Sequence, residues 1–426
     1  MHEKLGNMKY LLTAACLLFL FMGCKSDNDD QKPADRKSCQ RTVIFYLSGE
    51  NTLSGNVNDD LQEIKKGSVG LADDDRIVAF IDRENELPYI AEIKDGKTTL
   101  DQSLTFSEDF YASDPSKMQS ILNHIMTQYP SKSYGLVLWG HADGWLITPD
   151  SIATDAASGS KRRLGVSVQS FGQDTGTDNK GARQGAKWIN IPSLASTLES
   201  LPCKFRFIMA DCCNFQCVET AYELRHCTDY LIGSPAEIPN YGAPYDKLLA
   251  YMFDESDLFY HGIVDTYYSQ EDYSGKNYRV PLSVIRTDQL ESLAHETKEV
   301  LSSIDSRHLK TDGILYYWTV RYSNGYAPIM YDMRALLSAN LPQEAQDRIN
   351  SAIDKAVVYS KFSDYWMSSG TRIGFGSFTT KAENSCSMSM FLPMDAYTAT
   401  NMYGNLNKSI TQMQWYEASG LKDYGQ

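Results

Sequence analysis

The stretch Arg206–Tyr245 reads RFIMADCCNFQCVETAYELRHCTDYLIGSPAEIPNYGAPY, and its pattern decides the fold. The apolar run at 207–210 has the length of a buried strand, and a second such run follows at 230–233. Between them, apolar residues recur at helical spacing over residues 218–227, which predicts a helix packed by one face. Strand, turn, helix and strand form a βαβ unit, so we expect an α/β fold built on a parallel sheet.

The turn after the first of these strands carries Asp211, Cys212 and Cys213. Chemistry in open α/β sheets collects at the carboxyl ends of the strands, which is where Cys213 is expected. A cysteine alone is more often a small buried apolar residue, so a catalytic interpretation needs a partner. The segment Tyr134–Trp145, YGLVLWGHADGW, supplies one, because another strand-like run ends there at His141. A Cys–His pair needs proximity in space and not in sequence; the alternative for His141 is a strand-end histidine without a chemical role.

The WGHxxGW segment, and the D-x-C turn followed by VETAYEL, resemble the clostripain family of cysteine peptidases, which are relatives of the caspases and gingipains. The resemblance extends to VIFYL at 43–47, FGQDT at 171–175 and MSMFLP at 388–393. It implies a caspase-like αβα sandwich with a mostly parallel central sheet. We expect a catalytic domain over residues 41–255 and a C-terminal α/β subdomain over 256–426, which extends the sheet and shapes the cleft.

This resemblance implies hydrolysis of peptide bonds by a Cys–His dyad. Cys213 attacks the scissile carbonyl and His141 protonates the leaving amine. A helix N-terminus and an imidazolium beside the thiol are expected to lower its pKa. The backbone N–H groups of Ala142 and Cys213 are candidates for the oxyanion site, although the family usually has glycine at the position of Ala142. Cys212 is the rival nucleophile, and the D-x-C spacing favours Cys213.

Asp211 matches the acidic residue that precedes the nucleophile in the family and is associated with a pocket for basic side chains. A pocket carboxylate would pair with Arg or Lys, so we expect an endopeptidase that cleaves after these residues. The alternative for Asp211 is a capping or strand-end role. Glu237 and Asp246 flank the region where relatives use a second acid, but neither matches a motif.

Two other functions fit the same residues. The first is a non-catalytic surface binding lipoprotein on a peptidase-like scaffold, which the presence of both His141 and Cys213 argues against. The second is another Cys–His acyl-transfer enzyme, such as an amidase or transpeptidase, because the core chemistry is shared and only the pocket differs.

A long polar segment at 158–187 separates the two candidate motifs and contains Lys161, Arg162 and Arg163. Loops of this length inside compact domains are functional or disordered. Some members of the family mature by cutting themselves in the corresponding region, so self-cleavage at these basic residues is a hypothesis. The alternative is a solvated basic loop.

Residues 1–23 resemble a bacterial lipoprotein signal peptide, with Lys4 and Lys9 ahead of an apolar run that ends in FMGC. The implied processing is cleavage before Cys24 and lipidation of that cysteine; the alternative is an ordinary signal peptide. Residues 24–40 have the composition of an acidic flexible tether. The expected location is that of an exported lipoprotein anchored in the outer membrane, with display on the cell surface as a further hypothesis.

Composition excludes several function classes. The formal net charge of −14, without a strong basic patch, argues against nucleic acid, so protein or peptide substrates and a membrane are the expected partners. The nine cysteines do not form a disulfide scaffold or a zinc motif. Clostripain-like enzymes sometimes respond to calcium, but no EF-hand-like loop is present, and we assign no cofactor and no metal.

Local signals also predict individual elements. Asn56 is a plausible cap for a helix over 56–66, and Asp114 with Pro115 begins a helix that runs to about Tyr129. Asp95-Gly96 is expected to form the turn of a hairpin. Near the C-terminus, residues 396–406 are expected to be helical.

Overall fold

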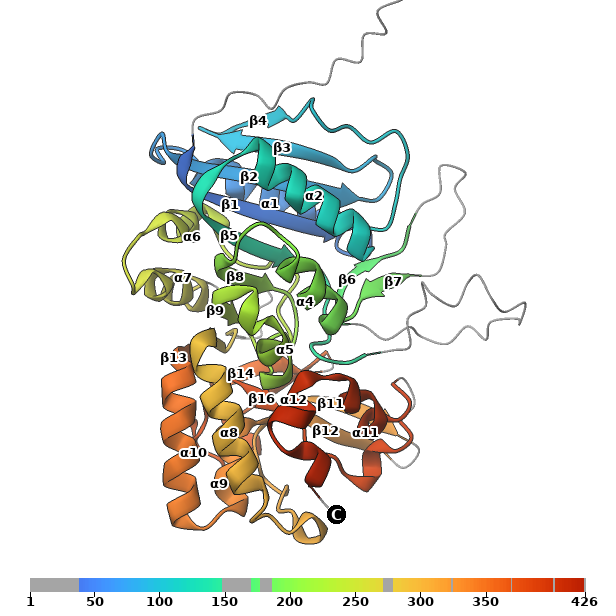
Figure 1. The fold of residues 1–426 in the computed structure, drawn as a ribbon, viewed down its shortest axis with the longest axis vertical. Helices are drawn as coiled ribbons and strands as arrows, with labels where there is room; N and C mark the ends of the chain where they lie inside the picture. The colour runs from blue at the N-terminus through green and yellow to red at the C-terminus, as the bar shows by residue number, and fades with distance from the viewer. Residues whose placement is uncertain are drawn as a thin grey trace, which may run out of the picture. The chain divides into compact units, whose positions relative to one another are not determined.

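The computed structural model describes residues 38–147, 170–176, 186–270, 279–322, 325–368, 370–400 and 403–424, which belong to one compact unit. Its centre is a nine-stranded sheet with the order β13-β10-β9-β8-β5-β1-β2-β3-β4 (Figure 1). The strands are β1 (Cys39–Gly49), β2 (Asp75–Arg83), β3 (Tyr89–Lys94), β4 (Lys97–Leu100), β5 (Ser131–Trp139), β8 (Phe205–Asp211), β9 (Thr228–Gly233), β10 (Leu282–Arg286) and β13 (Val357–Lys361).

The middle of the sheet is parallel. Neighbouring strands from β2 through β1, β5 and β8 to β9 pair in parallel, whereas both outer parts of the sheet pair antiparallel. Side chains of β1 alternate between two apolar cores: Ile44 and Tyr46 enter one, and Val43, Phe45 and Leu47 enter the other. A strand buried on both faces is typical of a parallel sheet covered by helices. The expected α/β fold with a largely parallel central sheet is therefore confirmed.

Helices cover both faces of the sheet. Buried residues of α1 (Ser54–Gly67), α6 (Tyr245–Leu248) and α7 (Phe259–Tyr268) join the core that contains Val43. The opposite core receives α2 (Pro115–Gln128), α4 (Ile191–Glu199) and α5 (Val218–Glu223). This layering is that of an αβα sandwich.

Three local predictions can be compared with the elements directly. Asp114 caps α2, because its side chain accepts hydrogen bonds from the N–H groups of Ser116 and Lys117. Asp95 and Gly96 have φ angles of 49° and 75° and form the expected turn between β3 and β4. The Asn56 cap is wrong: α1 begins at Ser54, so Asn56 lies inside the helix.

The C-terminal part adds helices and two small sheets beyond β10 and β13, coloured orange and red in Figure 1. The predicted helix over 396–406 is wrong, because 395–397 is a single 3₁₀ turn and the next helix begins only at Leu406. The domain boundary near residue 255 stays a prediction. The elements are α8 (Leu290–Leu301), β11 (Tyr316–Tyr322), β12 (Gly325–Asp332), α9 (Met333–Asn340), α10 (Gln343–Ala356), β14 (Tyr365–Ser368), β15 (Thr371–Gly374), β16 (Ser389–Met390), α11 (Leu406–Ser409) and α12 (Gln414–Ala418).

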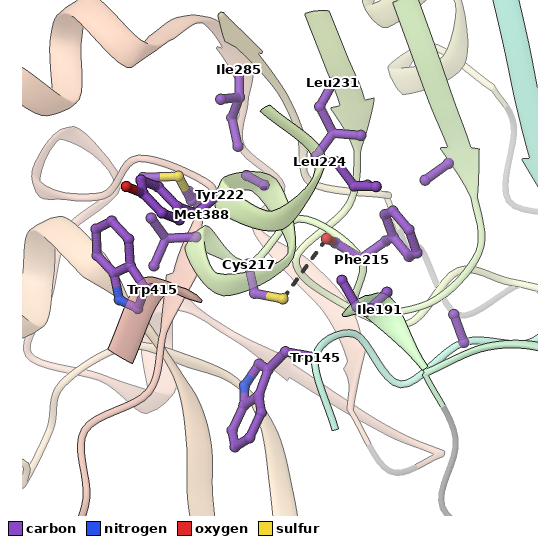
Figure 2. Close-up of a cluster of buried hydrophobic side chains, with 14 of the residues drawn as sticks. Trp145, Ile191, Phe215, Cys217, Tyr222, Leu224, Leu231, Ile285, Met388 and Trp415 are labelled. Atoms are coloured by element: carbon purple, nitrogen blue, oxygen red, sulfur yellow. Dashed lines mark hydrogen bonds between the residues drawn. The ribbon is translucent and has the colours of Figure 1, made fainter. Parts of the chain in front are cut away.

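A buried cluster ties the C-terminal part to the turn after β8. Figure 2 shows Trp415 beside Tyr222 of α5, and their rings make an edge contact with centroids 5.5 Å apart. Cys217, which precedes α5, forms a parallel bridge with Ser389 of β16. These contacts support the α5 end of the β8 turn with residues from the end of the chain. None of the helices in the described ranges is long and apolar enough to span a membrane.

Candidate active site

Two turns at the carboxyl ends of β5 and β8 carry the candidate dyad. The two strands are parallel neighbours, and Trp139 pairs with Asp211 at their ends. His141 and Cys213 each follow two residues later, so the register brings both turns to one edge of the sheet. Between Trp139 and His141, Gly140 has φ 144°, and a Cβ there would lie 2.8 Å from the carbonyl oxygen of Ser48. Glycine at this position therefore lets the His141 turn lie against the end of β1.

His141 and Cys213 line the same pocket, whose volume is about 540 Å³. Its wall includes the strand-end residues Trp139 and Asp211, the loop 238–242 that follows β9, and Leu53 just before α1. Met367 of β14 completes one side, so the C-terminal hairpin contributes to the cleft. The structure thus joins segments that lie far apart in the sequence around one concave site.

The thiol of Cys213 is half-buried and contacts the backbone of Ile238. The N–H of Ile238 donates to Sγ at 3.3 Å, and Sγ lies 3.8 Å from the carbonyl oxygen of the same residue. Burial raises the pKa of this thiol to about 12, with additional contributions from Glu237 and Asp143. The expected lowering of the thiol pKa is therefore wrong for this state. Helix α5 begins only at Val218, and its N-terminus does not adjoin the thiol.

The imidazole of His141 contacts a different partner. Its Nε2 lies 2.9 Å from the hydroxyl of Thr52, and burial lowers its pKa below the usual value. Its carbonyl oxygen accepts a hydrogen bond from Gly172 of β6 (Phe171–Asp174). Among the described residues, neither side chain hydrogen-bonds to the other. The candidate dyad thus has a thiol whose pKa is raised and an imidazole whose pKa is lowered, and each side chain contacts a neighbour of its own.

The two candidate oxyanion donors are backbone amides at these turns. Ala142 forms an antiparallel bridge with Phe171. The two hydrogen bonds of this bridge are donated by the N–H of Gly172 to His141 and by the N–H of Asp143 to Ser170, so neither uses the N–H of Ala142. The N–H groups of Ala142 and Cys213 donate to no other described residue. The turns also touch, since a Cβ on Gly144 would lie 2.5 Å from the carbonyl oxygen of Asn214. Both amides therefore remain free to donate beside the pocket.

Cys212 has a different environment from Cys213. Its side chain is 2% exposed and belongs to the apolar core that contains α5. Burial raises its thiol pKa well above the usual value. Both cysteines line the pocket, but Cys213 is half-buried whereas Cys212 is buried, and the choice of Cys213 as nucleophile stays a prediction.

Asp211 lies at the wall of the pocket and is held by three donors. The hydroxyls of Tyr245 and Tyr267 donate to its carboxylate at 2.6 and 2.7 Å, and the N–H of Ala243 donates at 3.0 Å. Burial raises its pKa, while these donors oppose the rise by stabilising the charged form. A Cβ on Gly242 would lie 2.9 Å from Oδ2 of Asp211, so the loop passes directly over this oxygen.

A second acid, Asp60 of α1, lies close behind this wall. It is 3.7 Å from the same added Cβ position, and its Oδ2 accepts a hydrogen bond from Nε1 of Trp139 at 2.7 Å. Burial, followed by the charge of Asp211, raises its pKa to about 9. The local sequence around Asp60 carries no signal that connects α1 with the turn after β8, so this residue was not predicted. Glu237 and Asp246 do not line the pocket: Asp246 pairs with Lys66, and Glu237 accepts from the N–H of Gly370.

A pocket that combines a thiol, an imidazole and free backbone amides at the ends of parallel strands is that of an α/β cysteine peptidase. The chain belongs to the clostripain family, whose model matches residues 45–423. Family membership makes the protein a cysteine peptidase that acts on peptides or proteins. None of the curated proteins matches this chain.

Solved structures agree with this assignment. A secreted C11 cysteine protease from Bacteroides thetaiotaomicron, in complex with an irreversible peptide inhibitor, is 26% identical with a TM-score of 0.71, over 90% of this chain and 99% of that chain. An inactive zymogen C11 protease from Parabacteroides distasonis is similar in fold, with 24% identity, a TM-score of 0.69 and the same coverage of both chains. A further secreted C11 cysteine protease from Bacteroides thetaiotaomicron, iotapain, shares the fold at 21% identity and a TM-score of 0.69, over 90% of this chain and 100% of that chain.

Two groups of predicted site residues lie outside the described residues. These are the lipidation candidate Cys24 and the self-cleavage candidates Lys161, Arg162 and Arg163.

Proposed function

We propose that this peptidase is an endopeptidase that cleaves after Arg or Lys, with Cys213 as nucleophile and His141 as acid and base. The imidazole takes the thiol proton, and Sγ forms a bond to the scissile carbonyl carbon. The amides of Ala142 and Cys213 donate to the resulting oxyanion. Collapse of this tetrahedral intermediate breaks the C–N bond while the imidazolium protonates the leaving amine. Water then hydrolyses the thioester.

The observation that carries the specificity is the acidic wall of the pocket. Asp211 lines the cavity beside Cys213, and Asp60 lies behind it. Neither carboxyl is in an ion pair within the described part of the chain. A basic side chain entering the pocket would therefore meet a carboxylate in a low-dielectric environment, where charge-assisted hydrogen bonds are strong. The solved relative that is 26% identical binds a peptide inhibitor, which supports a peptide ligand for this pocket.

The resting state needs a change before catalysis. The thiol contacts Ile238 and the imidazole contacts Thr52, so the proton transfer between them requires both side chains to move. We propose that self-cleavage within 158–187, at Lys161, Arg162 or Arg163, accompanies this change, because an enzyme with basic specificity can cut at these residues. The separate contacts of the thiol and the imidazole in the intact chain would keep the activity of the precursor low until cleavage.

The test combines substrate cleavage with the mass of the protein. Purified wild type, Cys213→Ala and Cys212→Ala would be assayed on fluorogenic peptides that end in Arg, Lys, Asp or Ala. We expect wild type and Cys212→Ala to cleave after Arg and Lys and to be split near residue 163. Cys213→Ala should remain intact and inactive. Cleavage by Cys213→Ala, or loss of activity only in Cys212→Ala, would contradict the assignment of the nucleophile. Activity on the Asp or Ala peptides alone would contradict the basic pocket.

We also propose that the mature chain is a lipoprotein, anchored in the outer membrane through Cys24 and joined to the enzyme by the tether at 24–40. The support is the signal-like sequence that ends in FMGC. Labelled palmitate supplied to cells should enter the wild type and a Cys16→Ser control, but not Cys24→Ser. Incorporation into Cys24→Ser would rule out this anchor. Digestion of the protein by protease added to intact cells would further indicate surface display.

A further inference from the structure

Three carboxylates meet beside the His141 turn and outside the substrate pocket. Glu50 follows β1, Asp82 lies near the end of β2, and Asp174 ends β6. One oxygen from each side chain lies within 4.8 Å of the others. All three residues are buried, with at most 1% of their surface exposed. Such close packing of acidic groups away from water is costly unless something compensates for it.

Asp82 is the carboxylate of the three that most needs a compensating ligand. Its side chain is fully buried, and neither of its two oxygens has a hydrogen-bond partner among the described residues. Both Asp82 and Asp174 also lack an ion pair with any described Lys, Arg or His. Asp174 does have donors, the N–H groups of Gly176 and Ala112. A buried carboxylate without a donor, aimed at two other carboxylates, has the environment of a ligand to a bound cation.

We propose that Glu50, Asp82 and Asp174 bind a hard divalent cation, calcium or magnesium. Carboxylate oxygens are the ligands these ions prefer, and calcium takes them at about 2.3–2.6 Å. Two oxygens on opposite sides of one calcium ion are therefore about 4.6–5.2 Å apart. The separations in this cluster fall within that limit. The three carboxylates come from separate elements and form no local loop motif, so the sequence predicts no metal site here.

The site is connected to the catalytic histidine through the backbone. The N–H and hydroxyl of Thr175, next to Asp174, donate to the carbonyl oxygen of Glu50 at 2.9 and 2.8 Å. Two residues after Glu50, Thr52 contacts Nε2 of His141. A cation shared by Glu50 and Asp174 would hold the loop of Thr52 against β6, whose Gly172 donates to the carbonyl oxygen of His141. The ion would thus brace the position of the imidazole without touching the substrate.

Shared protons are the competing way to neutralise this cluster. Burial and the neighbouring carboxylates raise the pKa of Asp82 well above its usual value, and burial raises that of Asp174 to about 6. A cluster that holds protons needs no metal. Direct measurement of metal binding separates the two, and this readout does not depend on peptidase activity.

The test uses the purified full chain, stripped of metal with EDTA and then titrated calorimetrically with calcium or magnesium. We expect one equivalent of cation to bind to the wild type and to raise its melting temperature. The variant Asp59→Asn, at an exposed residue outside the cluster, is the control and should bind like wild type. Asp82→Asn should bind at least about tenfold more weakly, because calcium affinity follows the charge of its ligands. Without metal, this variant should melt no lower than wild type, since the amide relieves repulsion.

Two results would overturn the proposal. If the stripped wild type binds neither cation at about 1 mM and its melting temperature does not change, the cluster holds protons only. If Asp82→Asn binds as tightly as wild type, the cation lies elsewhere in the molecule. If Asp82→Asn fails to fold, the proposal can still be tested, because metal binding by the stripped wild type does not depend on this variant.

Discussion

Two groups of buried acids, one at the pocket and one beside the His141 turn, differ in the hydrogen-bond donors that surround them. The pocket pair, Asp60 and Asp211, is supplied with donors: three reach Asp211, and the indole of Trp139 reaches Asp60. In the cluster of Glu50, Asp82 and Asp174, the carboxylate of Asp82 has no donor among the described residues. Both aspartates of the pocket pair therefore have hydrogen-bond donors, whereas Asp82 in the cluster has none among the described residues.

The difference indicates two kinds of ligand. Donors around Asp211 stabilise its charged form and oppose the rise in its pKa that burial causes, so this carboxyl is suited to pair with an incoming basic side chain. A cationic side chain can then enter and leave as substrate and product. In the cluster, Asp82 has no donor in the described part of the chain that would stabilise a buried negative charge. A bound cation or bound protons must therefore neutralise it. The pocket pair is thus suited to bind and release basic side chains, and the cluster is suited to keep a cation or protons bound.

The largest expected effect comes from removing the charge of the pocket pair. Asp211→Asn keeps one acceptor oxygen, enough for one of the two tyrosine hydroxyls, but loses the carboxylate that would face a basic side chain. Truncating one partner of a buried charge pair costs about 2–5 kcal/mol, so kcat/KM on Arg and Lys peptides should fall by roughly 30-fold to several thousand-fold. Steady-state kinetics on matched peptides with Arg, Lys or Gln at the cleavage site would measure this loss.

Controls for that prediction come from outside the pocket. Asp246→Asn removes a carboxylate that pairs with Lys66 and does not line the cavity, so it should leave kcat/KM nearly unchanged. The Gln peptide should lose little in Asp211→Asn, because it makes no charge pair. An equal fall on Gln and Arg peptides would indicate a disturbed fold and would break the distinction between the two acidic groups.

The sequence predicted the parallel core well because its signals are local. Continuous apolar runs marked β5 and β8, and the turns that follow them carry His141 and Cys213 to one pocket. Asp114-Pro115 and Asp95-Gly96 each act within a few residues, so a helix start and a hairpin turn could be predicted. The prediction that Asn56 caps the helix failed because α1 already begins at Ser54, with Leu53 at the N-cap position.

Long-range contacts explain what could not be predicted. Asp60 approaches Asp211 only because α1 packs beneath the loop after β9, and Asp82 meets Asp174 only because β6 returns to the end of β1. At 396–406, tertiary contacts override the helical pattern: Tyr397, for example, is buried and packs against Phe391. The raised pKa of the Cys213 thiol was missed for the same reason, since the burial that causes it involves residues distant in the sequence, such as Ile238 in the loop after β9.

A smaller effect is expected from the other member of the pocket pair. Asp60→Asn retains an acceptor for Trp139, and the wild-type carboxyl, with its pKa raised to about 9, is already neutral at pH 7. The substitution should therefore change kcat/KM on Arg peptides by no more than about fivefold at pH 7, the scale of one hydrogen bond. Asp211→Asn should exceed this effect at the same pH, and equal losses would show that both carboxyls are charged in the empty pocket.

The pH dependence of stability gives Asp60 a sharper test. Its pKa is raised on folding from about 3.9 in the unfolded chain, so its contribution is complete at acid pH and is lost as pH rises through about 9. Over that interval the wild type should lose up to about 1.4 kcal/mol of unfolding free energy per pH unit from this group. Asp60→Asn should lack this component, so its stability should improve relative to wild type between pH 5 and about 9. Urea unfolding of wild type, Asp60→Asn and the exposed control Asp59→Asn would measure the slopes. If the curves of Asp60→Asn and wild type ran parallel, Asp60 would be ionised in the folded enzyme, and the pocket pair would carry two charges instead of one.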